Sequence, residues 1–309
     1  MSILVTGATG FVGKNLIKSY SEKQDFRCVV RNGESDRFDD AYTVKSIDGK
    51  TKWDNCFNGV KSIIHLAGIA HEKTASDLDF QKVNIDGTLQ LALKAAEAGV
   101  KRFVFVSSIG VNGTKTTDTP FLPDDKPMPH NCYAISKYKA EVGLKDIAQK
   151  TGLEVVIVRP TLVYGVGAPG NFERLTKLIK LLSVLPFGLA TNRRNFIAVQ
   201  NLVDFLVTCA EHPKASGHTF LASDNEAVSI KEFSNLIAEG MGKKIYHLPL
   251  PLSLMNFIGK LTGKSLLVEQ LFGNLEVNSS NIKEVLNWTQ PYSMKEAMET
   301  LCTKEKYKS

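Results

Sequence analysis

The residues that most constrain the fold of this chain are three glycines that directly follow an apolar run near its start. Residues 3–13 read Ile-Leu-Val-Thr-Gly-Ala-Thr-Gly-Phe-Val-Gly, which predicts a buried strand, a tight turn and the start of a helix. Glycines at 7, 10 and 13 allow the turn, the approach of a phosphate to the backbone and close packing of helix on strand. The free N–H groups of such a helix bind a pyrophosphate. We therefore expect a dinucleotide to be bound by Gly7, Gly10, Phe11, Val12 and Gly13.

Composition excludes several other classes of protein. The chain has 309 residues, of which 43% are hydrophobic and 23% charged, so it has enough apolar residues for one large domain and one smaller one. Its net charge of +6 comes from scattered lysines and arginines, which favours an anionic small ligand over nucleic acid. The five cysteines are widely spaced and form no CxxC pair, so we expect no disulfide framework, no metal site and a reducing cytoplasm.

No segment of the chain has the length and hydropathy of a membrane span. We expect no cleavable signal, because the first predicted strand begins at Ser2. The two most apolar later stretches, 175–190 and 252–272, are interrupted by Lys, Gly, Pro or Glu, whereas a span needs roughly 20 apolar residues. We expect residues 252–272 to pack as helix, with peripheral membrane contact as the alternative.

Strand and helix patterns alternate through the first half of the chain. We expect the first helix to end near Tyr20 and strands at 27–30, 62–66, 102–106 and 155–158. A helix predicted over 86–98 carries Leu89, Leu93 and Ala96 on one stripe and ends at Gly99, a left-handed cap. This order predicts a doubly wound parallel sheet, an α/β Rossmann fold. We expect a Rossmann domain over 1–165, sheet contributions from about 190–222, and a mainly helical substrate lobe over most of 166–309.

The residue after the second predicted strand bears on which dinucleotide is bound. A carboxylate at this place holds the ribose hydroxyls of NAD, but here the chain has Arg31, with Arg37 nearby. A guanidinium can pair with the 2′-phosphate of NADP(H), although it can also be an ordinary surface arginine. We therefore favour NADP(H) and keep NAD as the alternative.

Tyr133 and Lys137 are one helical turn apart and therefore share a helix face. A free tyrosine titrates near pH ~10, so proton exchange at neutral pH requires its anion to be favoured, which a nearby ammonium would do. An isolated YxxxK is more often a surface pair, but downstream of a dinucleotide turn it indicates hydride chemistry.

Several motifs in order resemble one family. They are the glycine turn, His65-Leu66-Ala67-Gly68, Asn84 with Gly87-Thr88, Ser107-Ser108, the Tyr133/Lys137 pair, Arg159-Pro160, and Arg194 before Phe196-Ile197. Together they resemble the extended short-chain dehydrogenases/reductases of the nucleotide-sugar epimerase, dehydratase and reductase group. The resemblance implies that Tyr133 is the catalytic acid or base, that Lys137 is its electrostatic partner and a ribose ligand, and that Ser108 binds the reacting oxygen. Ser107 is the neighbouring candidate for the serine role.

The same resemblance assigns further positions. Asp48 would meet the adenine, although a turn role before Gly49 is equally open, while Ala67, Gly68 and Asn84 would line the cofactor. Pro160 would flank the nicotinamide. Asn171 and Arg194 would hold the diphosphate of a UDP-sugar, and His71 is left open between a substrate contact and a solvated loop residue. The family often dimerises through helices that include the one bearing Tyr133, so we expect a homodimer.

The residues after Ser108 discriminate among the reactions of this group. Its 4,6-dehydratases carry an Asp-Glu pair there, whereas this chain has Ile109 and Gly110, so we do not expect dehydration. Arg31 favours a reductase that consumes NADPH, and segments 104–113 and 192–195 resemble bacterial reductases of UDP-4-keto-6-deoxy-N-acetylglucosamine. The alternative is a UDP-sugar 4-epimerase with retained NAD. A non-catalytic dinucleotide-binding module is a third reading, which the intact Ser108, Tyr133 and Lys137 set opposes.

Overall fold

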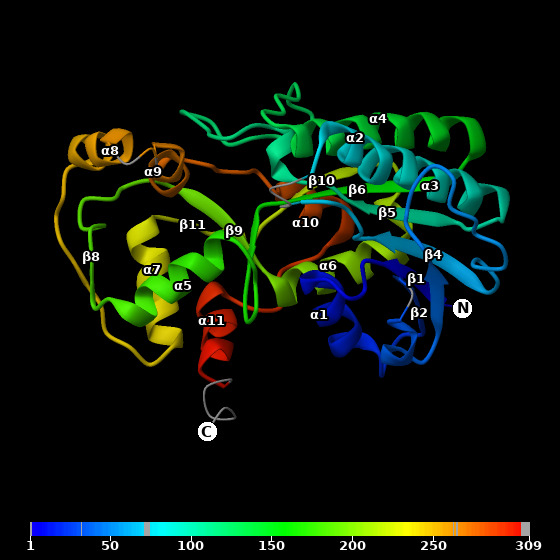
Figure 1. Ribbon diagram of the computed structural model, residues 1–309, viewed down its shortest axis with the longest axis horizontal. Coiled ribbons are helices and arrows are strands. Elements are labelled where there is room, and N and C mark those ends of the chain that lie inside the picture. The colour runs from blue at the N-terminus through cyan, green and yellow to red at the C-terminus, as the bar shows by residue number, and fades with distance from the viewer. Residues whose placement is uncertain (1, 32, 71–74, 262, 264, 304–309) are drawn as a thin grey trace.

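A seven-stranded parallel sheet forms the centre of the larger domain. The computed structural model describes residues 2–31, 33–70, 75–261, 263 and 265–303. The strand order is β10-β6-β5-β4-β1-β2-β3, and every neighbouring pair is parallel (Figure 1). The strands are β1 (Ser2–Thr6), β2 (Phe26–Arg31), β3 (Ala41–Val44), β4 (Val60–His65), β5 (Arg102–Val106), β6 (Glu154–Pro160) and β10 (Thr219–Ala222). The predicted α/β Rossmann fold is confirmed.

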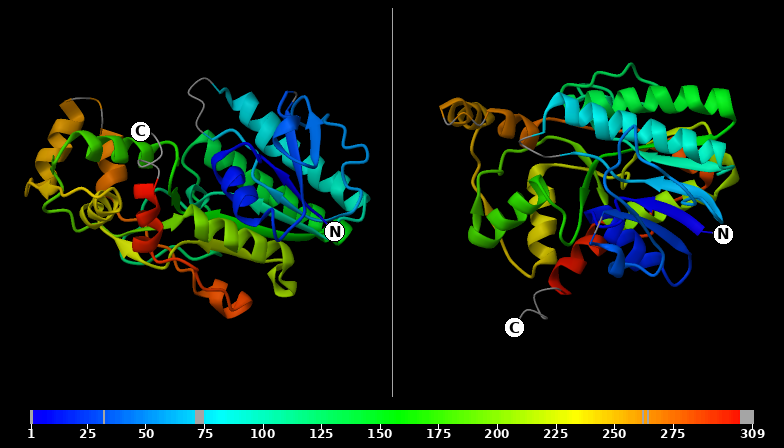
Figure 2. Two further views of the ribbon diagram at one scale, coloured as in Figure 1. Left: turned by 90° about the horizontal axis from the view of Figure 1, so that it is seen from below. Right: turned by 45° about the vertical axis from the view of Figure 1, so that its right-hand side comes forward.

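Helices cover both faces of this sheet, because alternate residues of its strands are apolar on opposite sides. Ile3 and Val5 of β1 belong to the core shared with α1 (Phe11–Tyr20) and α6 (Val199–Glu211). Leu4 belongs to the opposite core, which is shared with α3 (Thr88–Glu97) and α4 (Cys132–Thr151). Figure 2 shows the sheet and its helices from below and after a turn of 45° about the vertical axis.

Up to β6, the elements agree with the sequence predictions except around residues 41–44 and 77–97. Strand β3 was not predicted; it is an edge strand of four residues in which only Val44 is buried. The predicted helix over 86–98 is instead α2 (Asp77–Phe80), a π-helical segment (Gln81–Gly87) and α3, and Gly99 has the expected left-handed conformation at φ +79°.

The buried face of α3 also differs from the predicted stripe. Leu91, Ala92 and Ala95 are buried, whereas Leu93 is 38% exposed. Leu89 lies against Gly143 of α4, where an added Cβ would be 2.6 Å from its Cδ2. Because α3 packs on α4 as well as on the sheet, its buried face is rotated away from the Leu89/Leu93/Ala96 stripe.

The second lobe has its own small sheets and core. Strands β7 (Leu162–Tyr164), β9 (Arg194–Ala198) and β11 (Ala227–Val228) form one sheet, and β8 (Val184–Leu185) pairs with β12 (Tyr246–His247). Its helices are α5 (Asn171–Leu181), α7 (Ile230–Gly240), α8 (Leu252–Leu261), α9 (Ser265–Phe272) and α11 (Met294–Thr303). Phe196 and Phe233 stack in its core with ring centroids 3.8 Å apart.

The chain crosses between the two lobes more than once. Within 190–222, β9 joins the small sheet, while α6 and β10 belong to the large domain. Helix α10 (Ser280–Leu286) also returns to the large domain, where Ile282 and Leu286 are buried. Because β7 directly follows β6, the carboxyl edge of the large sheet faces the second lobe. Across the described ranges, no helix combines the length and hydropathy needed to cross a membrane.

Candidate active site

The glycine turn between β1 and α1 has the geometry that a pyrophosphate requires. Gly7 has φ +74°, and an added Cβ there would lie 2.8 Å from the Ala67 nitrogen. An added Cβ at Gly13 would lie 2.3 Å from the Gly7 carbonyl oxygen, so helix and turn are in direct backbone contact. Gly10 precedes α1 and offers no side-chain cap, which leaves the N–H groups of the first turn, at Phe11 and Val12, available for an anion. These residues fit a dinucleotide.

A buried hydrogen-bond chain fixes the loop that faces this turn. The Ala67 N–H donates to Thr6 Oγ1 at 3.2 Å, and Thr6 Oγ1 lies 2.6 Å from Nδ1 of His65. His65 Nε2 lies 2.9 Å from Thr88 Oγ1, whose hydroxyl donates to the Asn84 carbonyl at 2.8 Å. This order assigns the ring proton to Nε2. Burial, with a smaller contribution from the Lys137 charge, lowers the pKa of His65 to about 3, so the ring stays neutral.

Ser108, Tyr133 and Lys137 meet at the carboxyl edge of the sheet. Ser108 follows β5, and its Oγ accepts a 3.1 Å hydrogen bond from the Gly110 N–H. Tyr133 lies in the first turn of α4, which is capped by Asn131, and Ser108 is the side chain that lowers the pKa of its phenol. Ser107 points elsewhere, because it is buried and its hydroxyl donates to Glu141. The geometry therefore favours Ser108 over Ser107 as the partner of Tyr133.

The ionisation of the trio is set mainly by burial. Burial raises the pKa of Tyr133 to about 12, and the hydrogen bond from Ser108 opposes that rise. Burial lowers the pKa of Lys137 to about 8, and the Glu141 carboxylate opposes that fall. Lys137 donates from Nζ to the Val106 carbonyl at 2.9 Å and lies over the Phe105 ring, 4.7 Å from its centroid. The ammonium is thus held in place at the end of β5.

Gly68 and Asn84 lie next to that ammonium. An added Cβ at Gly68 would be 3.0 Å from Asn84 Oδ1 and 3.3 Å from Lys137 Nζ. The Asn84 side chain is fully buried, accepts from the Ile69 N–H at 2.8 Å, and donates to the Ile69 carbonyl and to Ser136 Oγ. The Asn84 amide therefore has its hydrogen-bond partners within the protein, and it holds the 67–69 loop in place through Ile69.

A buried ion pair joins α4, which carries Tyr133 and Lys137, to β6, and the sequence did not indicate it. Arg159 makes two contacts with Glu141, from Nη2 to Oε2 at 2.6 Å and from Nε to Oε1 at 2.9 Å. Ser107 donates to the same Oε1, and Arg159 also donates to Asn112 Oδ1 at 2.9 Å. Glu141 is one helical turn beyond Lys137, and this spacing places both residues on one face of the helix. The spacing does not show that Arg159 on β6 is the partner of Glu141. Pro160, the predicted nicotinamide neighbour, directly follows Arg159 and is buried.

The residues predicted at the adenine end lie at the surface. Arg31 ends β2 and is exposed, while Arg37 pairs with Glu34 at 3.2 Å. The Asp48 carboxylate accepts from Ser46 Oγ at 2.6 Å and from the Lys50 N–H at 2.8 Å. These hydrogen bonds hold the pKa of Asp48 below its usual value. Asp48 has the turn role that the sequence left open, and its adenine contact stays a prediction.

The residues predicted to hold the substrate lie in the second lobe near α9. Asn171 begins α5 and is exposed, with Nδ2 3.3 Å from Gln270 Oε1. Arg194 begins β9, is half-buried, and donates from Nη1 to the Gly273 carbonyl at 2.9 Å. Burial lowers the pKa of Arg194 to about 10, so it remains a cation at neutral pH. His71 falls outside the described residues.

Comparisons with known proteins show the family to which the chain belongs. The model of the NAD dependent epimerase/dehydratase family matches residues 3–222. A UDP-glucose 4-epimerase of Vibrio cholerae is 40% identical over 303 residues, 96% of this chain and 92% of its own length. An N-acetyl-α-D-glucosaminyl-diphospho-ditrans,octacis-undecaprenol 4-epimerase of Escherichia coli O157:H7 is 25% identical, covering 87% of this chain and 83% of its own.

Solved structures show the same fold. The structure of UDP-glucose 4-epimerase with UDP-glucose from Thermotoga maritima has a TM-score of 0.74, with 22% identity and 99% of both chains covered. No group of three or more His, Cys, Asp or Glu that could hold a metal is found among the described residues. The chain belongs to the NAD dependent epimerase/dehydratase family of extended short-chain dehydrogenases/reductases and is an NAD(P)-dependent enzyme.

Proposed function

We propose that the protein is a 4-epimerase of a UDP-linked hexose. The observation that carries this proposal is the Ser108, Tyr133 and Lys137 trio at the edge of the sheet, beside a dinucleotide turn and with no carboxylate after Ser108. Such a site exchanges hydride and proton at a carbinol carbon but has no pair of carboxyl groups at 109 and 110 for eliminating water. The 40% identity to a protein named UDP-glucose 4-epimerase supports the choice of C4.

In this proposal each residue of the trio has one task. Tyr133 removes the proton of the C4 hydroxyl and later returns it, and Ser108 donates a hydrogen bond to the same oxygen. Lys137, held by the Val106 carbonyl, supplies the positive charge that favours the tyrosinate. The bound dinucleotide supplies the hydride acceptor and, when oxidised, further positive charge. Without that charge Tyr133 stays protonated at neutral pH, in keeping with its pKa of about 12 in this structure, and cannot accept a proton.

A 4-ketone reductase is the second candidate, and Arg31 favours it. Arg31 ends β2 where an acidic residue would hold the ribose of NAD, and its exposure leaves it accessible to a 2′-phosphate. A reductase consumes and exchanges its cofactor, which suits NADPH. The favoured substrate of such a reductase is UDP-4-keto-6-deoxy-N-acetylglucosamine, with Asn171 and Arg194 at the diphosphate in either reaction.

The predicted homodimer would use the outer faces of α3 and α4. Leu93, Ile135 and Val142 expose apolar side chains on these two helices. Replacing Val142 with Glu would place charges in that interface, and sedimentation velocity should then show a shift from dimer to monomer. Unchanged sedimentation of a dimeric Val142→Glu variant would place the interface elsewhere.

One experiment separates the two candidate reactions. Purified protein is incubated with UDP-glucose or UDP-N-acetylglucosamine, and separately with the 4-keto-6-deoxy derivative of the latter and NADPH. Interconversion with the 4-epimer and no net cofactor change supports the epimerase, whereas stoichiometric loss of NADPH supports the reductase. The Tyr133→Phe variant should lose either activity; if neither wild-type reaction occurs, the substrate assignment is wrong.

A further inference from the structure

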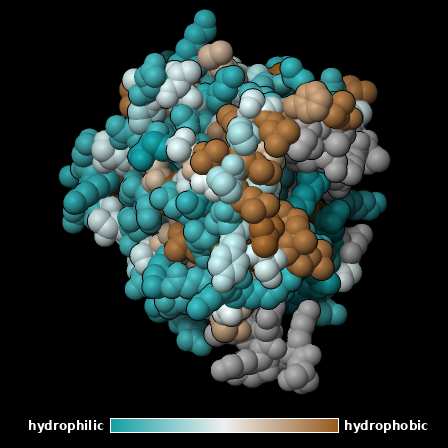
Figure 3. All heavy atoms as spheres, turned by 90° about the vertical axis from the view of Figure 1, so that its left-hand side faces the viewer, coloured by the Kyte–Doolittle hydropathy of each residue, from teal (hydrophilic) through white to brown (hydrophobic). Residues whose placement is uncertain are grey.

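The end of the second lobe farthest from the large domain exposes a group of large apolar side chains. Figure 3 views this end directly and shows several hydrophobic patches across it. We call the following exposed residues the apolar end: Leu181, Leu182, Val184, Leu189, Tyr246, Leu248, Leu252, Leu254, Phe257 and Leu261. Exposed apolar patches on a soluble protein mark interaction sites when they are contiguous and bordered by polar residues.

These side chains come from separate elements that the fold brings together. Val184 of β8 and Tyr246 of β12 are register partners in a parallel pair, and both are exposed. On α8, Leu254, Phe257 and Leu261 are spaced three and four residues apart, so they form one stripe along the helix. Phe257 is 58% exposed and Leu261 is 72% exposed. The stripe therefore faces away from the core of the lobe.

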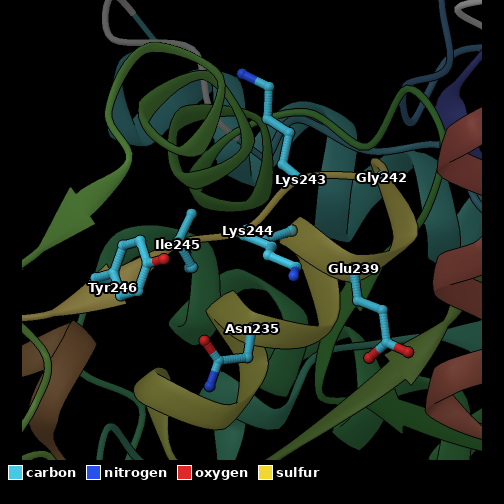
Figure 4. A pocket seen from close by; sticks show the side chains of 8 residues that line it. Asn235, Glu239, Gly242, Lys243, Lys244, Ile245 and Tyr246 are labelled. Carbon is cyan, nitrogen blue, oxygen red and sulfur yellow. The ribbon is translucent and has the colours of Figure 1, made fainter.

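The charge around the apolar end is positive. Residues 240–268 contain four lysines and no Asp or Glu. Lys243 and Lys244, with Tyr246, line a hollow of about 430 Å³ at the end of α7 (Figure 4). The one acidic lining residue, Glu239, points away from Lys243 in Figure 4 and pairs with Lys295 at 3.0 Å. Lys260 is exposed on α8, beside the stripe.

We propose that the apolar end docks on the surface of an anionic lipid bilayer. Leucine, phenylalanine and tyrosine side chains on an exposed helix and ribbon, bordered by lysines, have the composition of interfacial membrane-binding segments. Anionic headgroups complement the excess of lysine over Asp and Glu. Two copies of this face would bring the same lysines together, so the charge favours a bilayer over a second copy of the chain.

Co-sedimentation of the full chain with vesicles tests the proposal. The protein should sediment with vesicles of phosphatidylcholine and phosphatidylglycerol, sediment poorly with phosphatidylcholine alone, and be released by high salt. The double variant Phe257→Ser/Leu261→Ser should abolish sedimentation. Lys244→Gln and Lys260→Gln should each weaken the partition about fivefold, because one lysine near the surface contributes about 1 kcal/mol.

Matched variants at other exposed positions serve as controls. Leu78→Ser, at a residue 78% exposed on α2, and Lys283→Gln on α10 should sediment like the wild type. All variants should keep wild-type turnover of a nucleotide sugar in free solution, which shows that they are folded. The proposal is overturned if the wild type stays in solution with anionic vesicles, or if the apolar-end variants bind like the controls. It is equally overturned if Phe257→Ser/Leu261→Ser only converts a dimer to a monomer.

Discussion

The buried contact between Glu141 and Arg159 provides the sharpest test of how this site is supported. Glu141 is 1% exposed and Arg159 is 3% exposed, and two hydrogen-bonded contacts of 2.6 and 2.9 Å join them. Glu141→Gln keeps the size of the side chain but removes its charge, which leaves the Arg159 cation buried without its counter-ion. Breaking a buried pair in this way costs about 3–5 kcal/mol. With its amide oxygen in the place of Oε1, Gln can still accept two of the three hydrogen bonds, so we expect a loss at the lower end of this range, about 3 kcal/mol.

Urea unfolding of the protein without added ligand measures this loss. The matched control is Glu173→Gln, which breaks the exposed pair between Glu173 and Lys177 on α5, also 2.6 Å long. Solvent screens that exposed pair, so its loss should lower the free energy of unfolding far less than the loss of the buried pair. If the Glu141→Gln and Glu173→Gln variants unfold with the same free energy, burial does not strengthen the Glu141 contact and the reasoning is wrong.

The same variant has a kinetic consequence that a purely structural role would not produce. The Glu141 carboxylate opposes the fall in the pKa of Lys137, which burial lowers to about 8. Without that carboxylate the pKa of Lys137 falls further, so the ammonium is lost at a lower pH. The alkaline limb of the pH–rate profile should therefore shift to lower pH in Glu141→Gln and stay in place in Glu173→Gln. An unshifted limb would show that Glu141 does not act on Lys137.

Three further changes probe the site. Tyr133→Phe should reduce turnover about 10²- to 10⁴-fold with dinucleotide affinity unchanged by fluorescence titration, and Tyr138→Phe on the same helix should be neutral; loss of affinity instead would make Tyr133 a cofactor ligand. His65, with its pKa lowered from 6.5 to about 3, stabilises the fold fully above pH 6.5 and progressively less as the pH falls towards 3. Between pH 6.5 and pH 5 the loss in the free energy of unfolding is about 2 kcal/mol. The free energy of unfolding of His65→Gln, measured in urea, should therefore depend less on pH over this range; a dependence equal to that of the wild type would show that the buried histidine is not neutral. Arg31→Ala should weaken NADPH binding about tenfold and leave NADH binding unchanged; equal effects on both would remove the argument for NADP(H).

The sequence predicted the features of this protein that arise from local patterns. Apolar runs ending in glycine indicated β1 and its turn, and four of the remaining six strands of the large sheet lie within two residues of their predicted limits. The spacing of Tyr133 and Lys137 placed both on one face of α4 because helix geometry alone fixes that relation. The formation of a strand followed by a glycine turn likewise depends on about a dozen consecutive residues, because backbone sterics and side-chain burial determine it.

Tertiary structure decided the relations between residues far apart in the chain. Ser107 and Ser108 are neighbours in sequence but have different partners. The conformation of the chain after β5 directs Ser107 towards Glu141 and Ser108 towards Tyr133. The pairing of Glu141 with Arg159 required α4 to lie across β6, and the apolar end required β8, β12 and α8 to meet. Local periodicity specifies which face of an element is buried only when one neighbour covers it, as the rotated face of α3 between sheet and α4 shows. The sequence therefore determined the dinucleotide turn and the Tyr133/Lys137 pair, whereas packing between distant elements decided which charges and hydroxyls support that pair.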